Sequence, residues 1–239
     1  MYLGYYQVNK AVQEIYRWYR DNPSSRREAP ELTALYLELL LGAREKESII
    51  GTREPEEILR VHIIPSLLLA RRIAERTGAD IGSGNGLPGI LIAIYSPGSE
   101  LTMLEPKKGR AAFLSKVIAE TGIENAQVLR KRGEDAGRDP LFRERFGFAC
   151  ARAVAPPEVS LELALPLLTE GGRYYAQPGE EGAPLLTDKH CPLIREMGGE
   201  VEEKSGGVVI IRKVSATPSR FPRSWRSITA ASRLKKRRN

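Results

Sequence analysis

The pattern of hydrophobic and polar positions predicts a helical N-terminal segment over residues 1–76. Hydrophobic residues recur there at helical spacing in three stretches, which cover residues 8–19, 30–41 and 55–76. Pro30 and Pro55 open the second and third stretches, where proline fits the first turn of a helix. Pro65 lies inside the third stretch and predicts a kink, because proline has no backbone N–H to donate.

From Asp80 onward, short hydrophobic runs alternate with amphipathic runs, which is typical of βα units on a parallel sheet. The predicted strands cover residues 78–81, 100–104, 126–129, 146–151, 172–177, 200–204 and 207–214. The predicted helices between them cover residues 88–95, 107–121, 157–168 and 188–197. The first strand is weak, because its stretch RTGAD has little hydrophobic length. We expect an α/β domain over residues 77–214.

The net charge of +7 is concentrated near the C-terminus. Residues 204–239 hold 11 Lys or Arg and no Asp or Glu, whereas the preceding part of the chain has a net charge of −4. A basic tail over residues 215–239 is suited to neutralising nucleic-acid phosphates, in binding that weakens steeply with salt. A solvated end that only aids solubility is the alternative.

The cysteines and the hydrophobic runs indicate a cytoplasmic protein without membrane association. Cys150 and Cys191 follow no disulfide spacing pattern, and the first residues lack the blocks of a signal peptide. No run approaches the roughly 18 apolar residues of a membrane helix. Two histidines and no clustered cysteines predict no metal site.

The stretch ADIGSGNGLPGIL, residues 79–91, is suited to a ligand that approaches the backbone closely. A strand ending at this loop and a helix starting at Pro88 place N–H groups and the positive helix end around a bound group. Two motif frames fit: Gly84, Gly86 and Gly89 match G-x-G-x-x-G of dinucleotide-binding folds. The other frame, D-x-G-x-G-x-G of S-adenosylmethionine-dependent methyltransferases, is matched by Asp80, Gly82, Gly84 and Gly86.

Two acidic residues follow later strands at positions where such folds bind a nucleoside. Glu105 comes 23 residues after Gly82, at the tip of the second strand, where a carboxylate takes ribose hydroxyls in both folds. Glu134 follows the third strand in RGEDA, where methyltransferases usually place an acidic or amide side chain against the adenine amine. An exposed loop acid is the alternative for Glu134.

With these motifs in order, the chain resembles the RsmG family, also called GidB. The matching stretches span residues 53–223 and are REPEEILRVHIIPSLLLA, ADIGSGNGLPGILIAI, LTMLEPKKGRAAFLSKVIAETGIENAQVLRKRGEDA, ARAVAPPEVSLELALPLLTEGGRYYAQPG and TPSRFPR. The resemblance implies a Rossmann-like class I methyltransferase with a mixed seven-stranded sheet, whose last strand is antiparallel, and an N-terminal helical extension. It also implies transfer of a methyl group from S-adenosylmethionine to guanine N7 in 16S ribosomal RNA, by a monomer acting on the RNA or the small subunit.

The resemblance assigns roles to individual residues. Glu105 is implied at the ribose, Gly133 and Glu134 at the adenine, and Arg152 of ARAVA beside the methionine end as the candidate catalytic residue. An arginine in a surface ion pair is the alternative for Arg152. The whole implied cofactor set is Asp80, Gly82, Gly84, Leu87, Glu105, Gly133, Glu134 and Arg152. In TPSRFPR and the tail, charge and stacking surface suited to folded RNA interleave at Arg220, Phe221, Arg223, Trp225, Arg226 and Arg233, and rings that pack back on the domain are the alternative. The candidate RNA-binding residues are Arg53, His62, Arg220 and Arg223.

The N-terminal part departs from the family's usual pattern, so RNA recognition is more affected than cofactor binding. Ser48, Ile49 and Ile50 stand where the family usually has Asn-Leu-Thr. Val61 precedes His62, and Pro65 and Ser66 follow, where the family usually has Arg-His with Asp-Ser. For His62 a structural role on a hydrophobic helix is the favoured interpretation.

The implied chemistry needs no catalytic base, because guanine N7 carries a free lone pair and the enzyme contributes alignment and exclusion of water. Two alternatives remain. A nicotinamide-dependent oxidoreductase would use the other glycine frame and bind NAD. An RNA-binding ribosome assembly factor whose catalysis has lapsed would bind RNA without methyl transfer.

Overall fold

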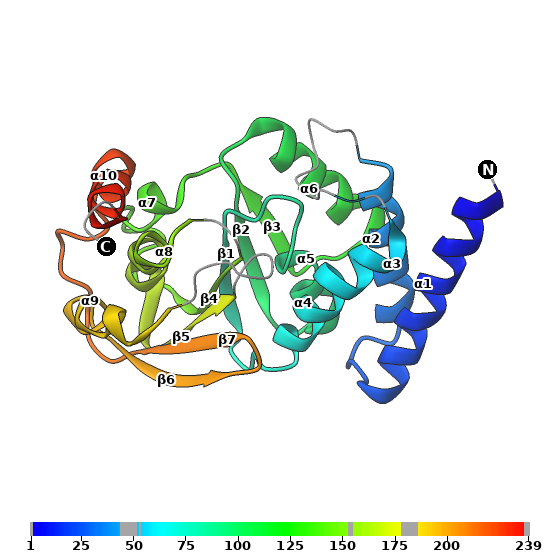
Figure 1. Ribbon diagram of the computed structural model, residues 1–239, viewed down its shortest axis with the longest axis horizontal. Coiled ribbons are helices and arrows are strands. Elements are labelled where there is room, and N and C mark those ends of the chain that lie inside the picture. The colour runs from blue at the N-terminus through cyan, green and yellow to red at the C-terminus, as the bar shows by residue number, and fades with distance from the viewer. Residues whose placement is uncertain (1, 44–51, 53, 153–154, 178–185, 237–239) are drawn as a thin grey trace. The chain divides into compact units, whose positions relative to one another are not determined.

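The computed structural model describes residues 2–43, 52, 54–152, 155–177 and 186–236 (Figure 1). The chain folds into two compact units. The first unit comprises Met1–Ala74 and Ser83–Arg130, and the second comprises Glu75–Gly82 and Lys131–Asn239. Among the described residues, no helix is both long and apolar enough to cross a membrane.

The first unit places helices against a pair of parallel strands. Its elements are α1 (Tyr2–Asp21), α2 (Ala29–Leu41), α3 (Pro55–Ile58), the π-helical turn η1 (Leu59–Ile63), α4 (Ile64–Ala70), α5 (Gly89–Tyr95), β2 (Glu100–Leu104), α6 (Lys108–Thr121) and β3 (Ala126–Leu129). Strand β2 pairs with β3, and α2 packs against both α5 and α6. The predicted helices and strands of this unit are all present, although the first helix begins six residues earlier than the predicted stretch and the third ends at Ala70 instead of residue 76.

The kink predicted at Pro65 takes the form of a π-helical turn. Three elements, α3, η1 and α4, follow one another without a break over Pro55–Ala70. Pro65 stands in the first turn of α4, directly after η1. Because its ring nitrogen has no hydrogen to donate to the carbonyl of Val61, the regular hydrogen-bond ladder is interrupted at this point.

The second unit contains the remaining five strands. Its elements are β1 (Thr77–Ile81), α7 (Gly133–Ala136), β4 (Phe146–Arg152), α8 (Pro157–Ala164), the 3-10 turn η2 (Leu165–Leu167), β5 (Leu168–Gln177), the 3-10 turn η3 (Asp188–His190), α9 (Cys191–Glu196), β6 (Gly199–Ser205), β7 (Val208–Lys213) and α10 (Trp225–Lys236). Helix α8 lies beside both α7 and α10 (Figure 1).

The seven strands are ordered β3-β2-β1-β4-β5-β7-β6. Strands β1, β4 and β5 run parallel, whereas β7 is antiparallel to both β5 and β6. The predicted mixed sheet with an antiparallel last strand is therefore confirmed.

Strand β1 forms despite its short hydrophobic run because β4 packs tightly against it. Gly78 lies opposite Phe148, and a Cβ atom on Gly78 would come within 2.0 Å of the Phe148 ring. The glycine therefore makes room for a buried aromatic side chain, which is 0% exposed. The hydrophobic contact that stabilises this strand comes from its neighbour.

Candidate functional site

The glycine loop after β1 has a backbone conformation that residues other than glycine rarely adopt. Gly82, Gly84 and Gly86 have φ angles of +65°, +56° and +95°. At Gly86 a Cβ atom would also lie 2.4 Å from the Ile90 side chain of α5. The positive φ angles require glycine here, and at Gly86 the α5 side chain also leaves no room for a Cβ atom.

Glu105 fixes the loop to the carboxyl end of β2 within the first unit. Its side chain is 3% exposed, and its two carboxylate oxygens accept the N–H groups of Gly84 at 3.0 Å and Lys107 at 2.8 Å. The N–H of Ser83 donates to the carbonyl oxygen of Leu104 at 3.2 Å. Each carboxylate oxygen carries two lone pairs, so Glu105 retains capacity for the hydroxyl groups of a ribose.

Helix α2 supports the same loop through a residue that sequence reasoning missed. The fully buried Tyr36 donates its hydroxyl hydrogen to the main-chain oxygen of Asn85 at 2.8 Å. A tyrosine in a helical pattern carries no sequence signal for this contact, because the bond joins residues 49 positions apart. The N-terminal helices therefore take part in shaping the loop.

In the second unit, Asp80 lies at the carboxyl end of β1, beside Cys150 of β4. The two residues are register partners, and the Cys150 thiol donates to the Asp80 carboxylate at 3.6 Å. Both side chains are buried, and burial followed by the Asp80 charge raises the pKa of the thiol well above its usual value. Cys150 is a neutral donor to this carboxylate, rather than the purely hydrophobic core residue that its strand suggests.

Gly133 and Glu134 follow at the start of α7. A Cβ atom on Gly133 would lie 3.1 Å from the Ile81 side chain, so the turn packs closely against the end of β1. Glu134 is 4% exposed, and burial raises its pKa above the ordinary value. Its nearest basic group is the Arg132 guanidinium, 3.9 Å away. Glu134 is thus a buried acid, and an exposed loop acid is excluded.

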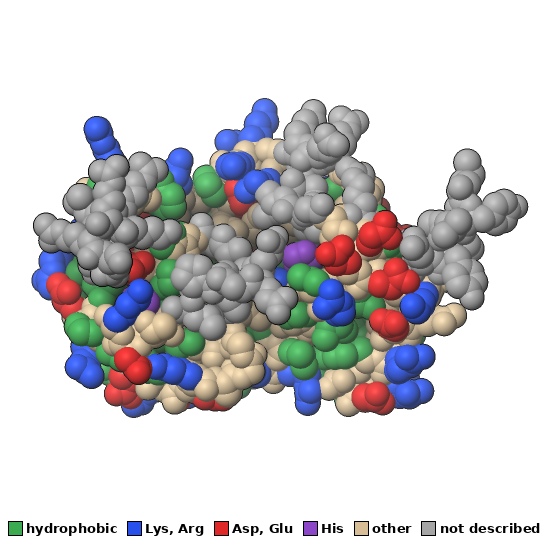
Figure 2. Space-filling model, viewed as in Figure 1, with side chains coloured by type: hydrophobic (Ala, Val, Ile, Leu, Met, Phe, Trp, Pro, Cys, Tyr) green, Lys and Arg blue, Asp and Glu red, His purple; other side chains and the backbone are tan. Residues whose placement is uncertain are grey.

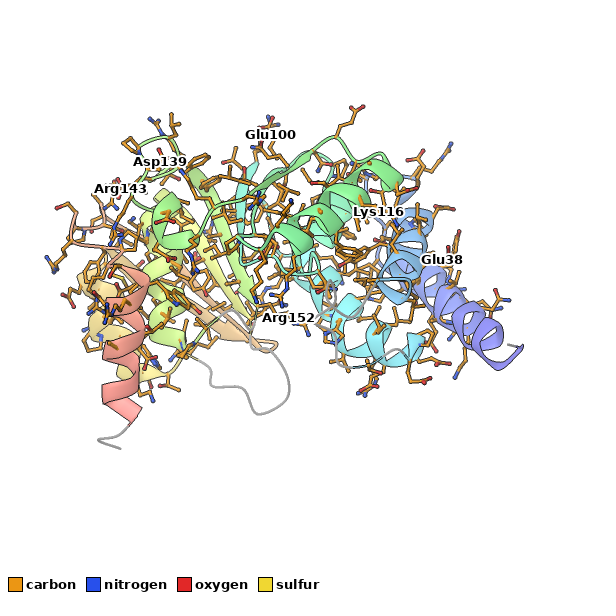
Figure 3. All side chains as sticks on the ribbon, turned by 90° about the horizontal axis from the view of Figure 1, so that it is seen from above. Glu38, Glu100, Lys116, Asp139, Arg143 and Arg152 are labelled. Carbon is orange, nitrogen blue, oxygen red and sulfur yellow. The ribbon has the colours of Figure 1, made fainter. Side chains whose placement is uncertain are left out.

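Arg152 is the last residue of β4 and the register partner of Gln177, the last residue of β5. Its side chain is partly exposed. Figure 3 shows Arg152 far from Arg143, which precedes the start of the same strand. In parallel α/β sheets ligands bind at the carboxyl ends of the strands, and Arg152 lies at that end.

The predicted N-terminal RNA contacts are only partly described. Arg53 and the departures at Ser48, Ile49 and Ile50 lie outside the described residues. His62 belongs to η1, is half-buried, and its main-chain oxygen accepts the Ser66 hydroxyl at 2.7 Å. Figure 2 shows acidic and basic side chains interspersed over this unit, with hydrophobic side chains at the surface near α4. The RNA-binding role of both residues stays a prediction.

The two predicted C-terminal RNA contacts each pair with an acid. The Arg220 side chain, 60% exposed, donates to Glu196 at 2.9 Å. Arg223 bonds both carboxylate oxygens of Glu162, a side chain of α8 that is 0% exposed. A buried carboxylate needs such a partner, so Arg223 has a structural role whatever it does toward RNA.

Each unit offers groups whose chemistry fits part of a nucleoside. Glu105 offers acceptors for vicinal hydroxyls, Glu134 is a buried acceptor for an exocyclic amine, and the loop at Gly84 allows a close approach. Leu87 is half-buried within that loop. Within the described part of the chain, no three His, Cys, Asp or Glu side chains form a group that could hold a metal ion.

Comparisons with known proteins agree on one family. The family model described as rRNA small subunit methyltransferase G matches residues 30–189. Ribosomal RNA small subunit methyltransferase G of Desulfitobacterium hafniense is 33% identical over 204 residues, which cover 81% of this chain and 84% of that protein. The protein of the same name from Rubrobacter xylanophilus is 34% identical over 238 residues, covering 91% and 90%.

Solved structures agree on the fold. A methyltransferase from Geobacter sulfurreducens superimposes with a TM-score of 0.50 at 16% identity, covering 84% of this chain and 96% of that chain. A SAM dependent methyltransferase from Aquifex aeolicus gives a TM-score of 0.50 at 15% identity, covering 66% and 93%. At these identities the likeness establishes the fold alone.

Proposed function

Because the chain belongs to the rRNA small subunit methyltransferase G family, we propose that it transfers a methyl group from S-adenosylmethionine to N7 of a guanine in 16S ribosomal RNA. The observation that carries this proposal is the family match over residues 30–189, which includes the glycine loop, Glu105, Glu134 and Arg152. We also propose that it acts in the cytoplasm as a monomer. Light scattering tests the oligomeric state.

The cofactor's nucleoside is assigned to three features. The glycine loop around Gly84 contacts the part of the nucleoside that comes closest to the protein backbone. Glu105 accepts from the ribose hydroxyls, and Glu134 accepts from the adenine amine. When bound, S-adenosylmethionine supplies a methyl group on a positively charged sulfur, which keeps the electron pair as its bond to the methyl carbon breaks. The protein's share is to hold that group in line with the acceptor and to exclude water.

Arg152 is the residue we assign to the acceptor side. Guanine N7 forms the new bond with its own lone pair, so no side chain has to remove a proton. An arginine at the tip of β4 is able to hold the guanine O6 or a neighbouring phosphate while the base is aligned. Arg152 is therefore proposed as an orienting catalytic residue and not as an acid or base.

The oxidoreductase alternative is disfavoured by topology as well as by family. Dinucleotide-binding sheets of the order 3-2-1-4-5-6 are parallel. Here β7 inserts antiparallel between β5 and β6. A calorimetric titration separates the two, because a methyltransferase binds S-adenosylhomocysteine and an oxidoreductase binds NAD.

The deciding experiment follows labelled methyl from S-adenosylmethionine into unmethylated small subunits and protein-free 16S RNA, with chemical cleavage at N7-methylguanine. We expect cleavage at a defined guanine, and a loss of at least about 100-fold in Arg152→Ala. The matched control is Arg145→Ala, an exposed arginine just before β4, which should retain activity.

Three results would contradict the proposal. Incorporation without cleavage would mean that another atom is methylated. No incorporation with S-adenosylhomocysteine still bound would favour the lapsed assembly factor. Full activity in Arg152→Ala would remove the assigned role of that arginine.

A further inference from the structure

An exposed tryptophan and an arginine lie together at the start of α10. The Arg132 guanidinium carbon is 5.9 Å from the centroid of the Trp225 ring, within the range of a cation–π contact. Both groups reach solvent, because Trp225 is 37% exposed and the Arg132 side chain is 53% exposed. The exposed part of the Trp225 ring is therefore accessible to a stacking partner.

The packing of α10 explains why this ring stays accessible. Helix α10 packs against α8, and Ile228 supplies the buried contact at 1% exposure. Trp225 is the first residue of the helix, and Arg226 beside it is exposed. The helix is thus anchored one turn beyond the tryptophan, at Ile228.

The cations near Trp225 differ in whether an acid pairs with them. Three of them are paired with an acid: Lys131 with Asp139, Arg220 with Glu196 and Arg223 with Glu162. Arg226 has no ion-pair partner among the described residues, and residues 204–239 contain no acidic residue. Arg132 faces the buried Glu134 on one side and the tryptophan ring on the other.

We propose that Arg132, Trp225 and Arg226 form a contact surface for ribosomal RNA, called here the tryptophan–arginine surface. An unpaired base stacks on the exposed part of the Trp225 ring, and the two guanidinium groups hold the flanking phosphates. Proteins recognise folded RNA largely through unstacked bases on aromatic rings and through arginine contacts to the backbone. This inference rests on the proposed function, since it takes the substrate RNA as the partner.

The placement of Arg132 links this surface to the cofactor residues of the same unit. Arg132 is two residues before Glu134, the acid assigned to adenine, and its guanidinium is within 3.9 Å of that carboxylate. An RNA phosphate bound by Arg132 therefore lies close to the residue that we assign to the adenine of the cofactor. The tryptophan–arginine surface would therefore bind the substrate RNA near the cofactor residues of this unit.

The test measures binding of the full-length chain to unmethylated 16S RNA in a Trp18→Phe background, in which Trp225 is the remaining tryptophan. RNA should quench Trp225 fluorescence. Trp225→Ala should weaken RNA binding about tenfold, whereas Trp225→Phe, which keeps a stacking ring, should stay within about threefold. Arg226→Gln should lower the salt slope of log affinity by about 1.

Three controls separate stacking from charge and from folding. Heparin, a polyanion without bases, should bind Trp225→Ala as it binds the parent. Arg212→Gln, an exposed arginine of β7, should leave RNA affinity unchanged. S-adenosylhomocysteine affinity should be the same in Trp225→Ala and the parent, which shows that the variant is folded.

The outcomes distinguish this surface from the proposed function. Unquenched fluorescence, or unchanged RNA affinity in Trp225→Ala while the parent methylates RNA, would overturn the surface and leave the function intact. Loss of heparin binding in Trp225→Ala would overturn base stacking. RNA binding that depends on Trp225 in a parent without methyl transfer would support the surface and contradict the function.

Discussion

Glu105 combines two roles at the scale of a single residue. Its carboxylate is bonded to Gly84 and Lys107, and we assign the same oxygens to the ribose hydroxyls. The loop therefore has its shape before any ligand arrives, which lowers the entropy lost on binding. A residue with both roles should matter more to affinity than a simple ligand contact would.

Replacing Glu105 with alanine should lower the affinity for S-adenosylhomocysteine at least about 100-fold, because hydrogen bonds to a charged group contribute about 1.5–3 kcal/mol each. Isothermal calorimetry measures the change. Glu100→Ala, at the exposed start of the same strand and labelled in Figure 3, is the control and should bind normally. Equal affinities for the two variants would contradict the assignment.

The pKa of Glu134 predicts how cofactor affinity depends on pH. Burial raises this pKa above the ordinary value of 4.5, and the ionised carboxylate is the form that accepts from the adenine amine. Affinity for S-adenosylhomocysteine should therefore fall as the pH drops toward the raised pKa, starting above pH 4.5.

Calorimetry between pH 4.5 and 8 tests this dependence, because at pH 4.5 an acid whose pKa lies above that value is mostly protonated. Glu134→Gln should bind more weakly at pH 7 and lose the dependence, since an amide does not titrate. Asp135→Asn, at the exposed neighbouring acid, should follow the parent. A parent whose affinity is flat across this range would show that Glu134 does not act as a charged acceptor.

At the scale of elements, the attachment of the C-terminal segment depends on ion pairs in which one partner is buried. Lys213 is 0% exposed, and its ammonium group donates to the Leu165 carbonyl at 2.8 Å and to Glu144 at 3.3 Å. Arg223 is bonded to the fully buried Glu162. The segment after β7 is thus tied to η2 and α8 by charged side chains.

Arg223→Ala should lower the free energy of unfolding by about 1–3 kcal/mol, because it leaves the Glu162 carboxylate buried without its partner. The estimate stays below that for a wholly buried pair because the Arg223 side chain is 40% exposed. Arg220→Ala removes an exposed pair and should change the same quantity by less than about 0.5 kcal/mol. Urea denaturation compares the two, and equal effects would contradict the structural role of Arg223.

The elements show where sequence reasoning succeeds and where it stops. Runs of hydrophobic residues predicted the strands and most helices, because burial of such runs is a local signal. Strand β5 begins at Leu168, four residues before its predicted start, since Gly171 and Gly172 read as a loop. A Cβ atom on Gly172 would meet the Gly147 carbonyl oxygen at 2.8 Å, so this glycine belongs to a close approach of strands. Helix α10 was not predicted either, because residues 215–239 were interpreted from their charge as a basic tail.

The sequence allowed the candidate cofactor residues to be placed at strand ends, and their roles stay predictions. Glycines and acids at such positions follow from the backbone chemistry of nucleotide binding, and the structure joins Glu105 to Gly84 by a hydrogen bond. The contacts of Tyr36 and Arg223 depend on residues far away in sequence, at Asn85 and Glu162, and no local pattern encodes them.

For the whole molecule, the uneven charge predicts how salt affects its two ligands. A chain that neutralises only three phosphates of single-stranded RNA has a log–log salt slope of about −2, so affinity should fall about 20-fold between about 50 and 200 mM salt. S-adenosylhomocysteine affinity should change less than about twofold. Filter binding and calorimetry measure the two; RNA affinity that is independent of salt would contradict a binding role for the basic C-terminal part.

The Arg143 side chain bonds to the main chain of other segments and not to their side chains. The Arg143 guanidinium donates to main-chain oxygens of Gly137, Thr217 and Phe221. Every residue type presents the same carbonyl group, so this arginine places few demands on which side chains the bonded residues carry. The route of the segment from 217 to 221 is therefore held through its main chain, separately from the buried contacts that the Thr217 and Phe221 side chains make.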